Sequence, residues 1–308
     1  MKMIIDIPTK EDFYSSADDM VNEAWEKISN LAHEYYELDS KNQFYLSSEY
    51  FTDGDVYGLD QYWHHARPKL ISALTLVLQS VEFKLKGLIA DISPYLLITG
   101  STKNIPKADE NGIRSFTQFH SIDAQDLIKV YEVFGDKQIS PKFKKWYEDI
   151  RILRNKFMHT VDKSSDINPE IIFKGIVYAH NELNQGGSNW IWHRYRYKAS
   201  HSGGGVDFNK DEISGDIFEM LQVHYELTGA IYSCSREVAN EIFNYDKSVD
   251  SDYCKKCVSA MAEFEYFDSK HIDYCLGTVQ RNKRSGMYQC IFCRNEYEKL
   301  PESIWEDD

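Results

Sequence analysis

The sequence predicts a mainly helical protein that ends in a small cysteine-bearing module. Three observations lead to this fold class. Apolar residues recur at helical spacing in several long stretches, prolines stand where helices would begin, and four of the six cysteines form two Cys-x-x-Cys pairs near the C-terminus. We predict an N-terminal helical and aromatic extension at residues 1–64, a helical domain at residues 65–247 and the module at residues 248–308.

The extension begins with a helix start signal at Thr9, because Asp12 follows three residues later in the pattern of a capping box. Apolar residues then recur up to Tyr35 at the spacing of an amphipathic helix, which we expect to pack on the following bundle. Residues 47–62 are rich in aromatic and turn residues. We interpret them as a connector whose rings pack on the core, with base stacking as the alternative.

Five segments of the central region show the apolar periodicity of bundle helices. Three of them begin at a proline, which is favoured at the first position of a helix. Asp123 is placed to cap a fourth segment. A Gly-Gly pair follows the segment at residues 169–183 and would end that helix. Helices in this order predict an all-α bundle. The segments are residues 68–90, 124–134, 141–159, 169–183 and 213–243.

The last turns of the segment at residues 141–159 hold Arg151, Arg154, Asn155 and His159. Arginine grips a phosphate in bidentate fashion, histidine transfers protons near neutral pH, and an amide orients a hydroxyl. This set suits cleavage of a phosphodiester without a metal ion. The alternative is structural, because Arg and His in a last turn complement the helix dipole and Arg151 has carboxylates nearby to pair with.

Glu82 is a polar residue within the apolar pattern of the segment at residues 68–90. One interpretation is an exposed pair with Lys86, four residues later. The other is that Glu82 faces the end of the segment at residues 141–159 and orients Arg154 or His159.

Residues 154–159, with the sequence RNKFMH, match the RN-x3-H motif of HEPN domains, and the Glu82-bearing segment resembles the first long helix of those domains. The resemblance covers roughly residues 65–185. It implies a HEPN-like helical bundle and a metal-independent endoribonuclease, a toxin or anti-phage defence effector that cuts RNA through attack of the 2′-hydroxyl. His159 would be the general acid or base, Arg154 would stabilise phosphate charge, and Asn155 and Glu82 would orient them.

The same resemblance implies a homodimer in which two motifs line one cleft, so that the acid and the base come from different subunits. Some similar domains are not catalytic. A nucleotide- or protein-binding module or sensor is therefore the alternative function.

Aromatic and basic residues alternate with period two at residues 190–198, WIWHRYRYK, which predicts a strand or the arm of a short β-hairpin insertion. One face of this strand would carry Arg194, Arg196 and Lys198. Cations meet phosphates and rings stack on bases, so we predict RNA contact at this face. The alternative is an edge strand whose charges prevent aggregation.

The C-terminal module has the ligand spacing of a zinc ribbon. Two Cys-x-x-Cys pairs can supply four thiolates to one tetrahedral Zn²⁺ per chain, and four thiolates leave no open position for a catalytic water. So small a segment has little core of its own, which favours a structural metal. His271 or Cys275 is the alternative for one ligand. The predicted ligands are Cys254, Cys257, Cys290 and Cys293.

The chain carries 49 acidic and 35 basic residues, for a formal net charge of −14. This charge argues against a broad nucleic-acid surface and indicates restricted access to RNA, or a regulatory protein partner that supplies positive surface. Residues 281–284 of the module offer cations to RNA or to such a partner. The sequence shows no apolar stretch of bilayer length and no signal-peptide core, so we expect a cytoplasmic protein without membrane contact.

Overall fold

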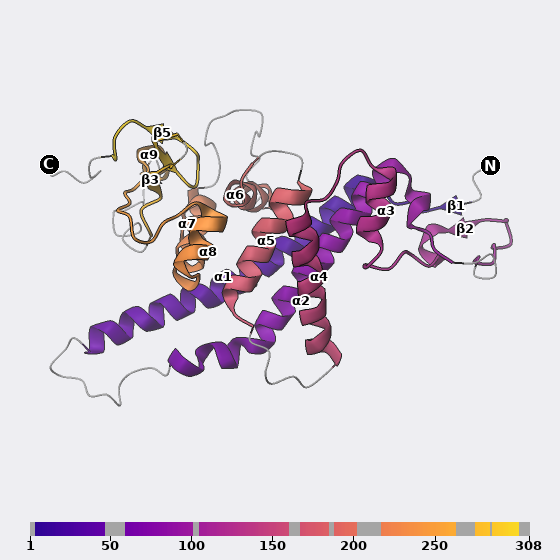
Figure 1. Ribbon diagram of the computed structural model, residues 1–308, viewed down its shortest axis with the longest axis horizontal. Helices are drawn as coiled ribbons and strands as arrows, with labels where there is room; N and C mark the ends of the chain where they lie inside the picture. The colour runs from indigo at the N-terminus through magenta and orange to yellow at the C-terminus, as the bar shows by residue number, and fades with distance from the viewer. Residues whose placement is uncertain are drawn as a thin grey trace. The chain divides into compact units, whose positions relative to one another are not determined.

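The computed structural model describes residues 4–46, 59–100, 105–159, 167–184, 188–201, 217–262, 275–283 and 285–301. This part of the chain is mainly helical with two small sheets (Figure 1). The helices are α1 (Lys10–Leu46), α2 (Leu59–Ile92), α3 (Leu127–Phe134), α4 (Pro141–His159), α5 (Pro169–Leu183), α6 (Trp190–His201), α7 (Ile217–Ser233), α8 (Arg236–Phe243) and α9 (Lys255–Ala262). Short 3₁₀ turns occupy Pro94–Leu97 and Phe116–Gln118.

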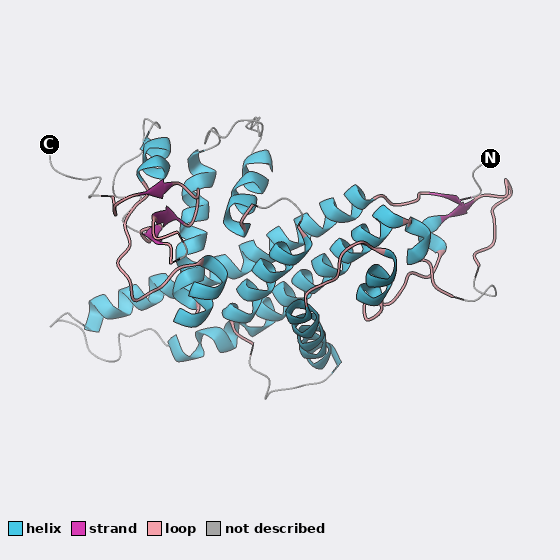
Figure 2. Ribbon diagram, turned by 45° about the horizontal axis from the view of Figure 1, so that its top comes forward, coloured by secondary structure: helices cyan, strands magenta, loops and turns pink. Residues whose placement is uncertain are grey.

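The strands form two separate sheets (Figure 2). Strand β1 (Ile4–Ile5) pairs in parallel with β2 (Arg114–Ser115). Strands β3 (Val279–Arg281), β4 (Tyr288–Cys290) and β5 (Glu296–Tyr297) form an antiparallel sheet in that order, with Val279 opposite Cys290 and Tyr288 opposite Tyr297.

The chain divides into two compact units, and the division falls within the long helices α1, α2 and α5. Unit 1 comprises residues 1–24, 71–166 and 178–185, and unit 2 comprises residues 25–70, 167–177 and 186–308. The boundaries drawn from the sequence at residues 64 and 247 stay predictions. No helix within the described ranges combines the length and the apolar character needed to cross a bilayer.

Unit 1 packs the first turns of α1 against α2, with α3, α4 and the end of α5 around them. Gly87 allows the closest approach, because a Cβ there would lie 2.6 Å from the ring of Tyr14. Ser80 of α2 donates its hydroxyl to the Ala17 carbonyl of α1 at 2.8 Å. The apolar core includes Leu74, Val77, Leu78, Val81, Leu85, Ile89, Leu127, Phe143 and Ile150, all buried.

Unit 2 is built around aromatic side chains. The ring of Trp25, fully buried, lies 5.0 Å from Phe173 and 5.4 Å from Trp190, and contacts Phe243 edge-on. Helix α7 packs against α6 and α9. The core of unit 2 therefore joins helices that are far apart in the sequence.

Several helix boundaries confirm the sequence signals. Helix α1 begins at Lys10, directly after Thr9. The Thr9 N–H donates to Asp12 Oδ2 at 2.8 Å, and the Asp12 N–H donates to Thr9 Oγ1 at 3.2 Å, which is the reciprocal bonding of a capping box. Helices α4 and α5 begin at Pro141 and Pro169, as predicted.

The predicted strand at residues 190–198, and with it the β-hairpin insertion, is wrong. These residues form helix α6, which the Asn189 side chain caps by accepting from the Trp192 N–H at 2.7 Å. The same residues that alternate between aromatic and basic also place apolar side chains at helical spacing. Packing of these side chains in the core stabilises the helix over the strand. The buried residues of α6 are Trp190, Ile191, Arg194, Tyr195 and Ala199.

Helix α2 begins at Leu59 rather than at Pro68, which lies inside the helix. An interior proline loses a backbone hydrogen bond. Packing of the preceding turns offsets this loss, because the Tyr62 hydroxyl donates to the Leu31 carbonyl at 2.9 Å and the ring of Trp63 lies 5.0 Å from Tyr35. Helix α3 starts at Leu127, three residues later than predicted.

The long pattern predicted at residues 213–243 is two helices, α7 and α8. The break lies at Cys234 and Ser235, where Ser235 Oγ accepts from the Val238 N–H at 3.3 Å and caps α8. Lys247 closes the end of α7 by donating to the carbonyls of Tyr232 and Cys234. Five predictions lie wholly or partly outside the described residues: the aromatic connector up to residue 58, the Gly-Gly pair after α5, residues 213–216, the alternative ligand His271 and residue 284 of the cationic stretch.

Candidate functional site

Helices α2 and α4 and the segment before α3 bring predicted site residues to one cavity of unit 1. Arg151, Arg154 and Asn155 share one face of α4 because they are three and four residues apart. Glu82 of α2 lies on the other side of the cavity, and residues 123–125 close it. The cavity has a volume of about 270 Å³.

Arg154 keeps donor capacity for a ligand. Its Nη1 donates to Asn155 Oδ1 at 3.1 Å. Its Nε is buried and has no hydrogen-bond partner among the described residues. The unpaired buried Nε is a cost to the fold. The residue also lines the cavity, so its guanidinium is a candidate ligand for an anion there.

Glu82 is half-buried beside these arginines. Burial raises the pKa of its carboxyl, and the positive charges of Lys86, Arg154 and Arg151 oppose that shift. Glu82 has no ion pair within 4.0 Å in the described part of the chain. The carboxylate therefore interacts with the two arginines by long-range electrostatics and forms no hydrogen bond with their guanidinium N–H groups.

Tyr147 anchors the floor of this region. Its hydroxyl donates to the Ala124 carbonyl at 3.4 Å, and the Arg151 guanidinium lies 5.6 Å from the centre of its ring. Burial, with the charge of Glu82, raises the pKa of Tyr147. The phenol stays neutral and fixes α4 against the segment before α3.

His159 is the last residue of α4, and its side chain lies outside the described residues. Helical spacing places position 159 on the same face as Asn155, four residues earlier. The structure thus assembles Glu82, Arg151, Arg154 and Asn155. The geometry of His159 toward them stays a prediction.

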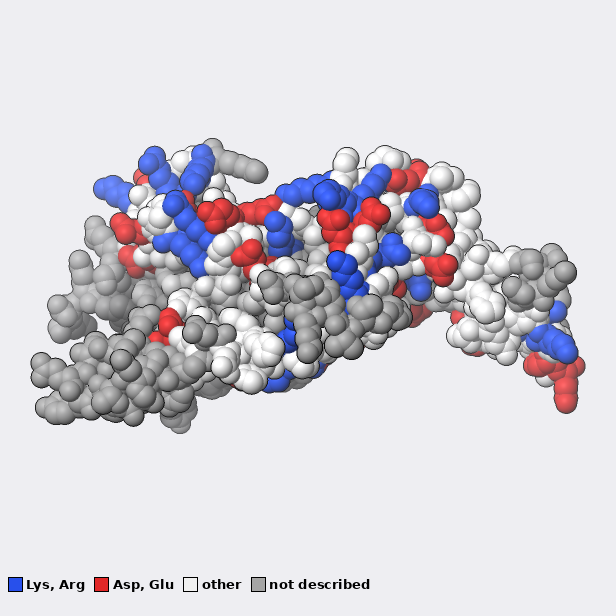
Figure 3. All heavy atoms as spheres, turned by 60° about the horizontal axis from the view of Figure 1, so that its bottom comes forward, with Lys and Arg blue, Asp and Glu red and all other residues white. Residues whose placement is uncertain are grey.

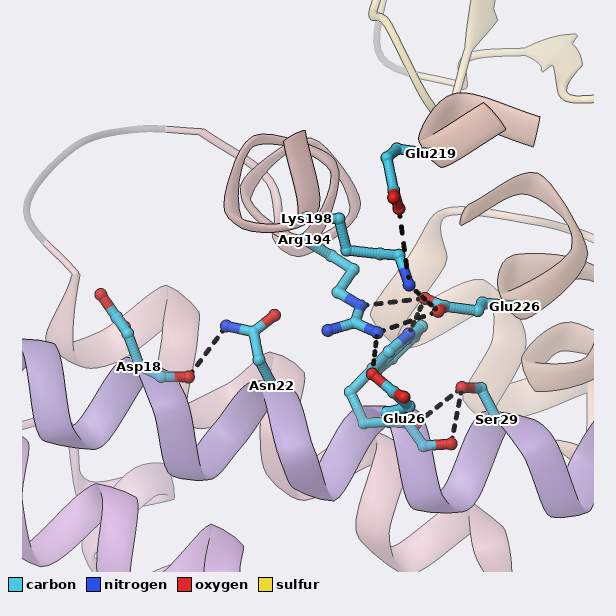
Figure 4. Close-up of polar contacts among 9 residues, drawn as sticks. Asp18, Asn22, Glu26, Ser29, Arg194, Lys198, Glu219 and Glu226 are labelled. Carbon is cyan, nitrogen blue, oxygen red and sulfur yellow. Dashed lines mark hydrogen bonds and ion pairs between the residues drawn. The ribbon is translucent and has the colours of Figure 1, made fainter. Parts of the chain in front are cut away.

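Arg194 lies in unit 2 and is only 1 % exposed. Its Nε and Nη2 donate to both carboxylate oxygens of Glu226 at 3.0 and 2.9 Å, and Nη2 also donates to Glu26 at 3.1 Å (Figure 4). Trp25 Nε1 donates to the same Glu226 carboxylate at 2.7 Å. Burial and this bonding count against the predicted contact of Arg194 with RNA.

Lys198 belongs to the same cluster. Its Nζ lies 3.6 Å from a carboxylate oxygen of Glu226 and 3.6 Å from one of Glu219, and its side chain is 12 % exposed. Arg196 lies on the exposed face of α6. The three cations predicted on one strand face thus have different surroundings. Arg194 and Lys198 lie among carboxylates in the interior, and Arg196 is exposed.

The four paired cysteines form a second candidate site in unit 2, and we call them the four-cysteine cluster. The ligand atoms of Cys254, Cys257, Cys290 and Cys293 all lie within 4.8 Å of one another. The Sγ atoms of Cys254 and Cys293 are 3.5 Å apart, and those of Cys257 and Cys290 are 3.9 Å apart. This arrangement can hold a metal ion.

Local structure explains how the two cysteine pairs meet. Helix α9 starts between Cys254 and Cys257, and a tight turn after β4 carries Cys290 and Cys293. Gly277 lets the segment before β3 cross Asp252 closely, because a Cβ at Gly277 would lie 2.8 Å from the Asp252 backbone. Backbone hydrogen bonds between Asp252 and Val279 then join the two knuckle-bearing segments.

Asp246 ties the C-terminal module to the end of α8, which the sequence did not indicate. Arg236 Nε donates to its carboxylate at 2.8 Å, and Lys283 lies 3.2 Å away. Arg236 and the N–H and hydroxyl of Ser248 hold the pKa of Asp246 well below its ordinary value. Gln280 of β3 accepts from the Asp246 N–H at 2.8 Å.

A stacked pair joins the module to α7. His224 lies against Phe292 of the second knuckle, with ring centres 4.4 Å apart and planes 8° from parallel. Burial lowers the pKa of His224 to about 4, so the ring is neutral at physiological pH.

The sequence also missed the role of residues 123–125 in the α4 cavity. Asp123 showed only a capping signal. No local signal places these residues beside Arg154, because they lie more than 20 residues before it in the chain.

Charge is mixed on the surface. Figure 3 shows Lys and Arg intermingled with Asp and Glu over the face that it presents, without a broad basic area there. Comparison of the chain with protein-family models, curated proteins and solved structures gave no significant match in any of the three.

Proposed function

We propose that the protein is a metal-independent endoribonuclease of the HEPN type, a toxin or defence effector acting in the cytoplasm. The observation that carries the proposal is the α4 cavity, which two arginines and two amides line together with the carboxylates of Glu82 and Asp123. Glu82 pairs with neither arginine. The guanidinium of Arg154, which lines this space, is the group that would meet an RNA phosphate.

In the proposed reaction a histidine accepts the proton of the ribose 2′-hydroxyl while that oxygen attacks the adjacent phosphorus. The bond to the 5′-oxygen breaks, and a second acid protonates the leaving oxygen. The products are a 2′,3′-cyclic phosphate and a 5′-hydroxyl. Arg154 stabilises the charge that develops on the phosphate, and Asn155 and Glu82 orient Arg154 and His159.

One histidine per motif makes a homodimer part of the proposal, with His159 of one subunit as base and the partner subunit's His159 as acid. This arrangement predicts that both histidines of a dimer are needed. Mixed dimers of wild type and His159→Ala would keep one histidine and would lose most of the cleavage. Mixed dimers as active as wild type would show that one histidine suffices.

The decisive experiment is cleavage of total tRNA and of a structured mRNA in EDTA, with product ends mapped. Wild-type protein is expected to leave cyclic-phosphate ends, and His159→Ala and Arg154→Ala are expected to lose the activity. Lys145→Ala is the matched control, because Lys145 is an exposed residue of α4 that pairs with Asp149 at 3.0 Å.

Failure of folded, dimeric wild-type protein to cut RNA in EDTA would reject the proposal in this form. Binding of RNA, a nucleotide or a protein without cleavage would favour the alternative of a non-catalytic module. A partner protein that restores cleavage would identify the regulatory partner that the net charge of −14 suggests.

We also propose that the four-cysteine cluster binds one structural Zn²⁺. Zn–S bonds of about 2.3 Å in a tetrahedron separate the sulfur atoms by roughly 3.8 Å. The Sγ separations of 3.5 and 3.9 Å fit this value. Four thiolates complete the coordination, so the ion would fold the module and take no part in RNA cleavage.

Metal analysis tests this assignment. One zinc per chain is expected, and Cys254→Ser and Cys290→Ser are expected to lose it together with thermal stability. Cys275→Ser is the matched control, because Cys275 is buried but lies outside the four-cysteine cluster. Loss of zinc in the control alone would transfer the ligand role to Cys275.

A further inference from the structure

A second hollow lies directly beside the α4 cavity in unit 1. It has a volume of about 460 Å³ and shares Gln125, Arg151 and Asn155 with that cavity. This size is within the range of small-ligand sites. We call it the α3–α4 groove, and its remaining lining residues are Ile128, Lys129, Lys144, Tyr147, Glu148 and Ile152.

The walls of the α3–α4 groove combine three chemistries. Ile128 of α3 and Ile152 of α4 supply apolar surface, and Ile152 is 51 % exposed. Gln125 and Asn155 supply side-chain amides. A nucleobase offers the complementary features, because it has apolar faces and an edge of donors and acceptors.

The groove is also cationic. Lys129, Lys144 and Arg151 line it, against the single carboxylate of Glu148. Lys129 is paired with Asp126 at 3.1 Å and Lys144 with Glu132 at 2.5 Å. An exposed pair such as that of Lys129 exchanges partners at little cost in free energy. A phosphate that follows the base would therefore find cations at the rim.

We propose that the α3–α4 groove binds the nucleoside next to the scissile phosphate of a single-stranded RNA. This inference rests on the proposed function, because the phosphate is the group that enters the α4 cavity. Gln125, Arg151 and Asn155 line both hollows, so a base in one would lie next to a phosphate in the other. Single-stranded RNA is required, because a base must leave its stack to lie between the two isoleucines.

Binding measurements on uncleavable RNA test the groove separately from catalysis. The probe is a fluorescent single-stranded oligoribonucleotide with 2′-O-methyl sugars, which cannot form the cyclic phosphate. Ile152→Glu places a negative charge in the groove at an exposed position and is expected to weaken binding at least tenfold. The matched control is Val133→Glu, because Val133 is 72 % exposed and does not line either hollow.

A second variant guards against indirect effects. Gln125→Ala removes an amide from an exposed position, and we expect it to change the preference among the four bases more than the total affinity. A duplex of the same sequence is expected to bind more weakly than the single strand.

The outcomes separate the two proposals. Equal binding by wild type, Ile152→Glu and Val133→Glu would overturn the groove assignment, as would absence of RNA binding by wild type. Weaker binding by Ile152→Glu alone would support it. If His159→Ala still cuts RNA, the proposed catalytic mechanism fails while the binding result for the groove stands.

Discussion

Two arginine-centred clusters differ in how fully their donors are used. Arg154 of α4 donates to a neighbouring amide, has a buried Nε without a partner in the described structure and borders a cavity. Arg194 of α6 is buried, donates to both oxygens of Glu226 and reaches Glu26 as well. From the sequence both arginines qualify as phosphate ligands.

The difference shows that charge and aromatic neighbours do not identify an anion site. A buried arginine saturated by carboxylates contributes to the core, and removal of one partner leaves an uncompensated charge. An arginine with open donors and a carboxylate beyond pairing distance keeps its capacity for a ligand. The number of donors satisfied within the protein separates the two roles.

The largest effect on stability is expected at Arg194. Glu226→Ala leaves its guanidinium buried without its main partner, and we expect a loss of about 3–5 kcal/mol in the free energy of unfolding. Urea denaturation followed by circular dichroism measures the loss. The double variant Arg194→Met with Glu226→Leu, which removes both charges, should lose less. A Glu226→Ala protein as stable as wild type would show that the cluster of Figure 4 does not support the core.

Arg154→Ala is expected to have the opposite profile. RNA cleavage should fall by about 10²–10³-fold, the range for loss of a donor to a developing charge. The free energy of unfolding should change by less than about 0.5 kcal/mol, as for surface positions. Arg154→Lys keeps the charge but not the planar fork, so it should restore only part of the rate. A large loss of stability in Arg154→Ala would make the residue structural.

Glu82→Gln should gain stability and lose activity. The folded-state pKa of Glu82 is raised above its ordinary 4.5, so its contribution to stability is present below that pH and is lost as the pH rises through the folded pKa. Above the folded pKa the ionised carboxylate is a cost that glutamine removes. The gain in the free energy of unfolding should be smaller than the loss in Glu226→Ala. It should disappear at acidic pH, where the Glu82 carboxyl is protonated. Denaturation curves across this pH range, with cleavage rates at pH 7, test both directions.

Lys145→Ala is expected to have the smallest effect. The exposed Lys145–Asp149 pair on α4 should contribute about 0.3–0.5 kcal/mol, and high salt should remove the difference. Cleavage should stay at the wild-type rate. A loss of activity in this variant would extend the RNA surface along α4 beyond the two hollows.

Signals that act over a few residues were sufficient for much of the fold. The Thr9–Asp12 capping box and the prolines at 141 and 169 set helix starts because their effects are confined to one turn. The spacing of the two cysteine pairs predicted the four-cysteine cluster, since each knuckle is local and thiols of this spacing favour one metal.

Other features depended on contacts between distant segments. Residues 190–198 carry two periodicities at once, and packing of Trp190, Arg194 and Tyr195 in unit 2 selects the helical one. Pro68 marks no helix start because Tyr62 and Trp63 pack on α1. Local propensity is worth less than the burial that these contacts provide.

The sequence by itself determined the helical class, the four-cysteine cluster and the Arg154–Asn155 pair on one helix, all of which depend on spacing along the chain. Tertiary structure alone decided which arginine is open and which is saturated. It also decided that Glu82 and residues 123–125 border Arg154, and that a groove lies beside them. The physical reason is that burial and donor satisfaction are properties of all the segments packed around a side chain, and no local pattern contains them.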